Sequence, residues 1–228
     1  MKSIVLACTL ALCAWTARAA PVVFDDTQYF TTTFAWVGAT TVAHDDSGMQ
    51  SGLPLFTASD VTGDDGGAAS ASAIADTGFL SALTSAVGGP DGSSALASAE
   101  FLGSFVADGR PILIGLDTAF DGIGNAIRVI VIGDGGTLFD RTWTSGGLHQ
   151  SYLDIAAGTI GSIDILVTSS TDALTGELAS AAASTGFAVT AVPEPSTLTF
   201  MALAGLCAFA VLQGQQVRRR RRTEAAGG

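Results

Sequence analysis

Hydrophobic and polar residues alternate over short segments, most clearly in the second half of the chain. Residues 163–168 and 187–191 alternate in this way, and 128–132 is a β-branched run bounded by Gly, Asn and Asp. Short strands separated by such turns at intervals of about ten residues predict a mainly β fold, a β-sandwich or a jelly roll. Similar segments are 138–143, 152–155 and, near the N-terminus, the one-sided pattern of Phe30, Thr32, Phe34 and Trp36.

The pattern is weaker where Ala and Ser dominate. Residues 68–87 and 94–106 fit either strands with small side chains or short helices. Residues 173–184 fit a short helix or a mobile loop. Because no boundary or clean repeat divides residues 20–191, we expect a single β-rich ectodomain there.

The N-terminus has the features of a secretory signal peptide. Lys2 precedes the apolar run 4–15, and small residues in Ala17-Arg18-Ala19 place cleavage before Ala20. The run is too short to span a membrane. Residues 1–19 are therefore predicted to direct export through the Sec machinery. The ectodomain that remains contains no cysteine, so it has no disulfide.

The C-terminus has the features of a stop-transfer segment. Counted from Ser196 to Leu212, seventeen mostly apolar residues give a helix of about 26 Å. Against a hydrocarbon core of about 30 Å this predicts a single, marginal transmembrane helix. The basic cluster that follows would hold the tail in the cytoplasm; it consists of Arg218, Arg219, Arg220, Arg221 and Arg222.

Pro193-Glu194-Pro195 stands directly before that helix. Two prolines one residue apart prevent helix and strand, which leaves the backbone extended and accessible to an enzyme. The order of Pro-Glu-Pro, short apolar helix and arginine cluster in residues 192–222 resembles the PEP-CTERM sorting signal of Gram-negative bacteria. Residues 223–228 extend beyond that pattern as a short tail.

The resemblance carries several implications. An exosortase, which is a membrane-embedded cysteine transpeptidase, would recognise Pro193, Glu194 and Pro195. The helix would anchor the chain in the inner membrane before processing, after which the ectodomain would reach the outer envelope or the extracellular matrix. Proteins of this type are typically exported by species that make exopolysaccharide, which is therefore a further expected partner.

Charge excludes one class of partner. Between Ala20 and Val192 the basic residues are Arg110, Arg128 and Arg141, and nineteen acidic residues against these three give a net charge of −16. Such a surface repels phosphate groups, so no nucleic-acid partner is expected.

The candidate catalytic residues do not form a convincing constellation. His44-Asp45-Asp46 fits a polar turn better than a metal site, and His149 has no Gly-x-Ser-x-Gly motif to serve as a triad partner. Asp76-Thr77-Gly78 resembles an aspartic-protease loop but occurs once, although that chemistry needs two aspartates. Nothing in the sequence pairs Glu100 with Glu177 for glycoside hydrolysis. We therefore expect no enzymatic activity.

Two binding functions stay open. No cofactor is predicted, but calcium suits the Asp- and Gly-containing loops, which equally fit ordinary β-turns. These loops contain Asp60, Asp64, Asp65, Asp117, Asp121 and Asp134. A sugar-stacking platform or core packing are the alternatives for the aromatic residues Tyr29, Trp36, Trp143 and Tyr152.

The sequence thus predicts an exported, acidic structural protein of the cell envelope or exopolysaccharide matrix. The alternative is a carbohydrate-binding module, which requires Trp143 or Tyr152 to be exposed in a groove. A secreted hydrolase is the third hypothesis.

Overall fold

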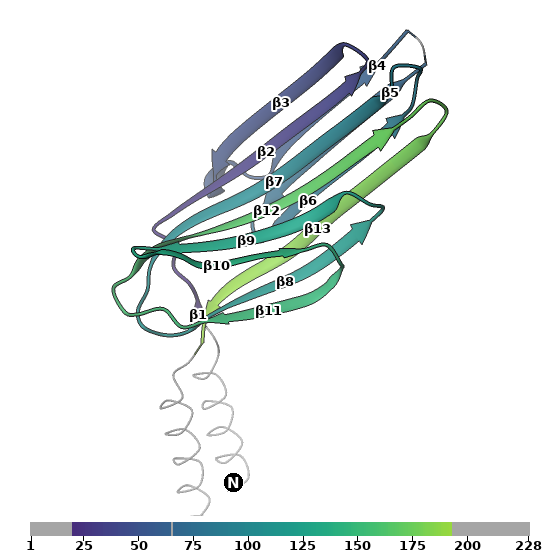
Figure 1. The fold of residues 1–228 in the computed structure, drawn as a ribbon. Helices are drawn as coiled ribbons and strands as arrows, with labels where there is room; N and C mark the ends of the chain where they lie inside the picture. Colours follow the sequence, from purple (N-terminus) through teal and green to yellow (C-terminus); the bar gives the residue numbers. More distant parts are fainter. Residues whose placement is uncertain (1–19, 65, 193–228) are drawn as a thin grey trace, which may run out of the picture. The chain divides into compact units, whose positions relative to one another are not determined.

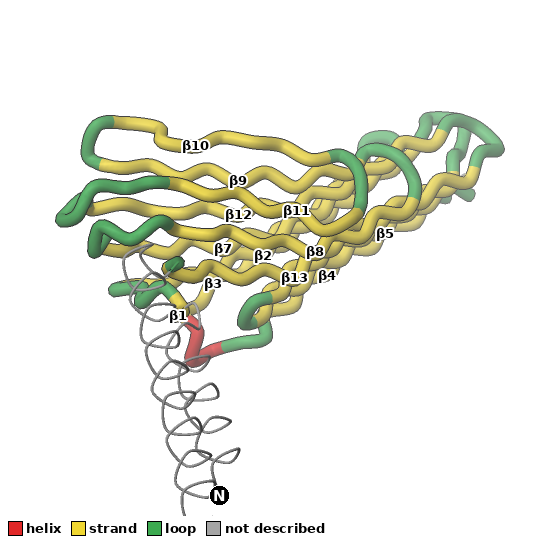
Figure 2. Tube along the Cα trace, turned by 90° about the horizontal axis from the view of Figure 1, so that it is seen from below, coloured by secondary structure: helices red, strands yellow, loops and turns green. Residues whose placement is uncertain are grey.

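Two antiparallel β-sheets lie face to face in the computed structural model, which describes residues 20–64 and 66–192 (Figure 1). Figure 2 shows that loops gather at the two ends of the strands. The prediction of a mainly β fold is confirmed. Residues Pro21–Thr190 form one compact unit.

The strands divide between the sheets as follows. Sheet A contains β1 (Ala20–Pro21), β4 (Leu55–Thr62), β5 (Ala68–Asp76), β6 (Phe79–Val87), β8 (Ile112–Asp121), β11 (Gly147–Leu153) and β13 (Leu178–Ala191). Sheet B contains β2 (Asp26–Val37), β3 (Thr40–Met49), β7 (Ser93–Val106), β9 (Asn125–Gly133), β10 (Gly136–Trp143) and β12 (Ile160–Ala173). A 3-10 turn, η1 (Gln50–Gly52), follows β3.

Strand order differs from chain order in both sheets. Sheet A runs β11-β8-β13-β6-β5-β4, with β1 beside β13, and sheet B runs β10-β9-β12-β7-β2-β3. The long strand β12 pairs antiparallel with β7 on one side and β9 on the other. Apart from β1, the strands of the first half of the chain lie side by side in each sheet and those of the second half lie side by side beyond them, and the two groups meet at the β6–β13 and β7–β12 pairs.

The core between the sheets has a large-residue part and a small-residue part. Aliphatic side chains of β8, β9 and β12, such as Ile114, Val129 and Ile165, are almost completely buried. Alanines take the inward positions of β5 and several of those of β6 and β7, and the Cα atoms of β5 and β7 approach within 8 Å across the two layers. Facing sheets usually lie about 10 Å apart, so the alanines permit unusually close packing.

This close packing explains why the Ala/Ser segments are strands. Ala69, Ala71, Ala73 and Ala75 of β5 are buried and alternate with half-buried residues, which is a period of two. Residues 68–87 and 94–106 therefore follow the strand alternative that the sequence left open. A short helix or a loop was predicted for residues 173–184. This is wrong from Leu178 onward, where β13 begins and pairs with β6 through Gly186.

The one-sided aromatic pattern of β2 faces outward. Phe34 and Trp36 are each 38% exposed, whereas Thr33 and Ala35 on the other face are completely buried. The physical reason is the thin layer opposite: the hydroxyls of Thr33 and Ser59 share a 2.8 Å hydrogen bond across the sheets, which leaves no room for an indole.

Several predicted features lie outside the described residues. These are the signal peptide 1–19, the Pro-Glu-Pro motif, the transmembrane helix and the arginine cluster. Within the described residues, no helix has the length and hydropathy needed to cross a membrane.

Candidate functional site

The polar residues singled out from the sequence mostly occupy turns and edges. His44 is exposed on the edge strand β3, and Asp46 accepts a hydrogen bond from the backbone N–H of Ser47. Asp76 likewise accepts a 2.7 Å bond from the N–H of Thr77 at the β5–β6 turn. Asp76 therefore has the local bonding of a turn, whereas His44-Asp45-Asp46 lies within strand β3, so the polar turn expected there is wrong.

The remaining acidic candidates are dispersed. Asp60 lies in β4, Asp117 and Asp121 in β8, and Asp134 in the turn after β9. Within the described part of the chain, no group of three or more His, Cys, Asp or Glu side chains could hold a metal ion. Calcium binding stays a prediction. Glu177 caps its own turn by accepting a bond from the N–H of Leu174, apart from Glu100 in β7.

The four aromatic candidates separate into two buried and two exposed residues. Tyr29 and Trp143 are 2% and 7% exposed, while Trp36 and Tyr152 are 38% and 66% exposed. Because Trp36 lies in sheet B and Tyr152 in sheet A, the four do not form one platform.

Trp143 helps to close the open edge between the sheets. Its ring centroid lies 5.3 Å from that of His149, and the guanidinium of Arg141 lies 5.3 Å from it. The His149 Nε2 is 3.1 Å from the carbonyl oxygen of Ser145. His149 therefore has a packing role between β10 and β11.

The structure also brings together an acidic pair that sequence reasoning missed. Glu100 in β7 lies opposite Leu166, and Asp164 in β12 lies opposite Leu102, so the two carboxylates are diagonal neighbours on adjacent strands. Burial, and then the negative charge of Asp164, raises the pKa of Glu100. Burial also raises the pKa of Asp164, although the positive charge of Arg128 partly offsets this.

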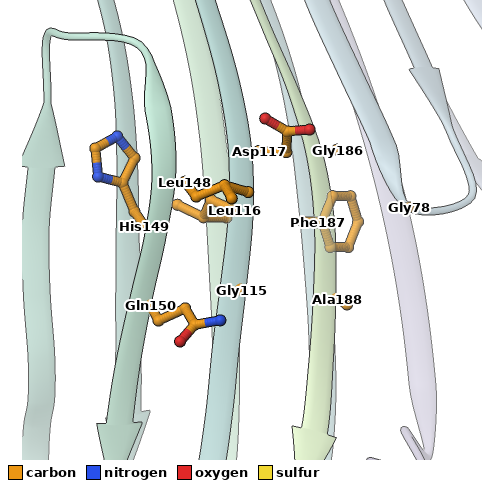
Figure 3. A pocket seen from close by; sticks show the side chains of 10 residues that line it. All are labelled: Gly78, Gly115, Leu116, Asp117, Leu148, His149, Gln150, Gly186, Phe187 and Ala188. Atoms are coloured by element: carbon orange, nitrogen blue, oxygen red, sulfur yellow. The ribbon is translucent and has the colours of Figure 1, made fainter.

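A groove of about 370 Å³ crosses the outer face of sheet A. We call it the outer groove. It spans the adjacent strands β11, β8 and β13 and reaches the β5–β6 turn. Figure 3 shows Leu148 and Gln150 extending from β11 toward β8, and His149 pointing away from them. The lining residues are Gly78, Gly115, Leu116, Asp117, Leu148, His149, Gln150, Gly186, Phe187 and Ala188.

The chemistry of the outer groove is mixed. Gly115, Gly186 and Ala188 offer almost no side chain in the middle of it. Gln150 supplies an amide and Asp117 a carboxylate beside the 80% exposed Leu148. Tyr152 follows Gln150 by two residues and is exposed, so it continues the same face of β11 beyond the groove. The carbohydrate-binding alternative requires Trp143 or Tyr152 to be exposed in a groove. Trp143 is buried, and Tyr152 is exposed next to the outer groove without being one of the residues that line it.

Comparison with known families finds one match. Residues 191–222 match the model of the PEP-CTERM protein-sorting motif, which confirms the resemblance. The chain therefore carries this sorting motif, which indicates exosortase-dependent sorting of an exported protein that is membrane-anchored before processing. A comparison with curated proteins finds no match.

Similarity to solved structures is weak. The carbohydrate-binding module TmCBM61 in complex with β-1,4-galactotriose is 13% identical, with a TM-score of 0.27 over 60% of this chain and 88% of its own. The enzymatically active domain of bacteriophage CBA120 tailspike protein 4 is 12% identical, with a TM-score of 0.27 over 60% of this chain. This chain spans only 19% of that tailspike chain. At these TM-scores the likenesses carry no argument.

Proposed function

We propose that the chain is a non-enzymatic structural component of the cell envelope or exopolysaccharide matrix, delivered there by its sorting signal. One observation carries this proposal. The last strand of the described residues, β13, lies between β8 and β6 inside sheet A and ends at Ala191, the residue at which the sorting motif begins. No linker separates the folded sheet from the signal, so the two-sheet fold is itself the cargo.

The surface charge supports an extracellular, hydrated setting. Arg110 forms an ion pair with Asp108, and Arg128 donates bonds of 2.9 and 2.6 Å to Asp140. Arg141 lies over Trp143. Since each arginine between residues 20 and 192 has a local partner, most of the other acidic groups face solvent with little opposing charge. Such a surface keeps the protein soluble and able to associate with polymer through divalent cations.

The proposal is tested by locating the native protein and sequencing its C-terminus by mass spectrometry in fractionated host cells. Wild type should occur in the outer envelope or the medium without Arg218–Arg222. A Glu194→Gln variant should stay in the inner-membrane fraction with these arginines intact, because the recognition motif is altered. Glu224→Gln lies outside the matched residues and is the control; it should behave as wild type. Intact wild-type chains confined to the inner membrane would contradict the proposal.

A carbohydrate-binding module is the second candidate function. The observation that favours it is the exposed Tyr152 beside the outer groove. A secreted hydrolase is the third, and absence of turnover with glycan and peptide substrates would remove it.

A further inference from the structure

Two glycines of the outer groove are not required by the fold. Gly115 and Gly186 lie inside β8 and β13, where glycine weakens a strand. Neither has a positive φ. A Cβ added at Gly115 would come within 3.8 Å of the carbonyl oxygen of Ala188, and one at Gly186 within 3.9 Å of that of Gly78. Both distances are ordinary van der Waals contacts.

Two other strand glycines are explained by packing. A Cβ at Gly103 in β7 would lie 2.6 Å from the ring of Phe24, and one at Gly161 in β12 would lie 2.8 Å from the ring of Phe105. These glycines make room for buried aromatic rings. Gly115 and Gly186 make room for no side chain of the described protein, so the space above them is free for a ligand. Glycine inside a strand often marks a position that a ligand approaches closely.

We infer that the outer groove binds a neutral glycan chain; this rests on the proposed function and names its ligand class and site. Because Gly115 and Gly186 have no side chains, a pyranose ring can approach the sheet closely between them. The Gln150 amide can both donate to and accept from hydroxyl groups, and Asp117 can accept from them. Leu148 and the Tyr152 ring supply exposed apolar surface for the C–H faces of sugars.

Other ligand classes fit the groove less well. A peptide that adds a strand needs an unpaired sheet edge. The groove lies on a sheet face: β8 and β13 are paired on both sides, and the unpaired side of the edge strand β11 is the one away from β8. An anionic ligand would meet Asp117, and the residues that line the groove include no Lys or Arg. The net charge of −16 around it adds to the repulsion.

The test is native affinity electrophoresis of the full-length protein in a detergent that contains no sugar. The gels hold hydroxyethylcellulose, galactan, mannan or dextran, and alginate serves as the anionic polymer. At least one neutral polymer should retard wild type, and alginate should not. Retardation by alginate alone, or by none of the five, would overturn the inference.

Variants then locate the site. Tyr152→Ala and Gln150→Ala remove surface groups and should each weaken binding, the former by about tenfold. Gly186→Val places a branched side chain in the middle of the outer groove and should abolish binding. Trp36→Ala is the matched control, because it removes an exposed aromatic from the other sheet, and it should bind as wild type. Thermal unfolding of each variant separates loss of the site from loss of the fold. Unchanged binding by folded Tyr152→Ala and Gln150→Ala would overturn the inference, as would loss in Trp36→Ala alone.

This test is independent of delivery. A protein that reaches the outer envelope but binds no neutral glycan keeps the proposed function and refutes the groove. A protein that binds glycan but stays intact in the inner membrane refutes the proposed function and keeps the glycan site in the groove.

Discussion

At the scale of single residues, Glu100 and Asp164 oppose the stability of the fold at neutral pH. Both carboxylates are partly buried on the outer face of sheet B, and Asp164 Oδ1 is buried without a hydrogen-bond partner. Burial disfavours their charged forms, and the charge of Asp164 adds to the penalty on Glu100. A carboxyl with a raised pKa binds its proton more tightly in the folded state than in the unfolded state.

Glu100→Gln should therefore stabilise the protein at pH 7. Stability from the wild-type pair is greatest below the ordinary Glu pKa of 4.5 and falls as the pH rises through the raised pKa of the folded state. The gain from the substitution should accordingly be largest at neutral pH and shrink on acidification. Thermal unfolding of the full chain between pH 4 and pH 8 measures this.

The control substitution, Asp140→Asn, should change the stability in the opposite direction. The Arg128 guanidinium hydrogen-bonds to Asp140 and holds the pKa of that carboxyl below its usual range. Asp140→Asn should lower stability at neutral pH, with an effect that fades as the pH falls through the lowered pKa. If Glu100→Gln destabilised the protein at pH 7 as Asp140→Asn does, the acidic pair would be stabilising and the argument wrong.

At the scale of elements, the loops after β6 and after β12 hold each other in place. The N–H of Gly88 donates to the carbonyl oxygen of Glu177 at 2.9 Å, and the N–H of Gly176 donates to that of Gly88 at 3.0 Å. A Cβ at Gly88 would lie only 1.7 Å from the carbonyl oxygen of Leu174. The two backbones approach so closely that only glycine fits at position 88.

Gly88→Ala should thus be severely destabilising, by about 4 kcal/mol or more, because rigid backbone and not a flexible side chain stands in the way. Gly135→Ala is the matched control: it also changes a glycine in a turn, but no atom lies within 4 Å of its added Cβ. Denaturant unfolding of the two variants should separate them clearly. Similar midpoints would show that the loops can move apart.

Alternation along the chain was enough to predict strands, but not which face of each strand is buried. The pattern at β2 marks two faces, and the aromatic one faces solvent because the opposing layer of sheet A admits only small residues such as Ala73. The same thin layer makes Ala181 and Ala183 adequate core residues of β13, where the sequence suggested a helix or loop. Inter-sheet spacing is a property of both sheets together, so no single segment encodes it.

For a related reason, the sequence did not show which residues of the candidate sites lie together in the fold. The sorting signal was predictable because its parts are contiguous in sequence. The outer groove instead combines Gly115, Gln150 and Gly186, and these meet only through the order β11-β8-β13. Glu100 and Asp164 likewise become neighbours only through the register of β7 and β12. The alternation around Asp164 placed it on a strand face but could not supply its partner.

At the scale of the whole molecule, negative charge is spread over both sheets with little compensation. Acidic side chains lie in β3, β4, β8 and several turns, whereas Arg110 and Arg128 are each committed to an adjacent aspartate. Repulsion among like charges opposes the compact state. Its range depends on salt, since the Debye length falls from about 30 Å at 0.01 M to about 8 Å at 0.15 M ionic strength.

Raising NaCl from about 0.01 to 0.15 M should therefore raise the thermal unfolding midpoint of the full chain, because screening relieves repulsion across the sheets more than it weakens the two short-range ion pairs. CaCl₂ at matched ionic strength separates screening from specific binding. A further rise with calcium, removed by a chelator, would support the calcium site that the Asp-rich loops predict, whereas an equal rise assigns the effect to screening alone. A midpoint that fell with NaCl would mean that Arg128–Asp140 and Arg110–Asp108 outweigh the repulsion, and the acidic surface would then not limit the stability of this fold.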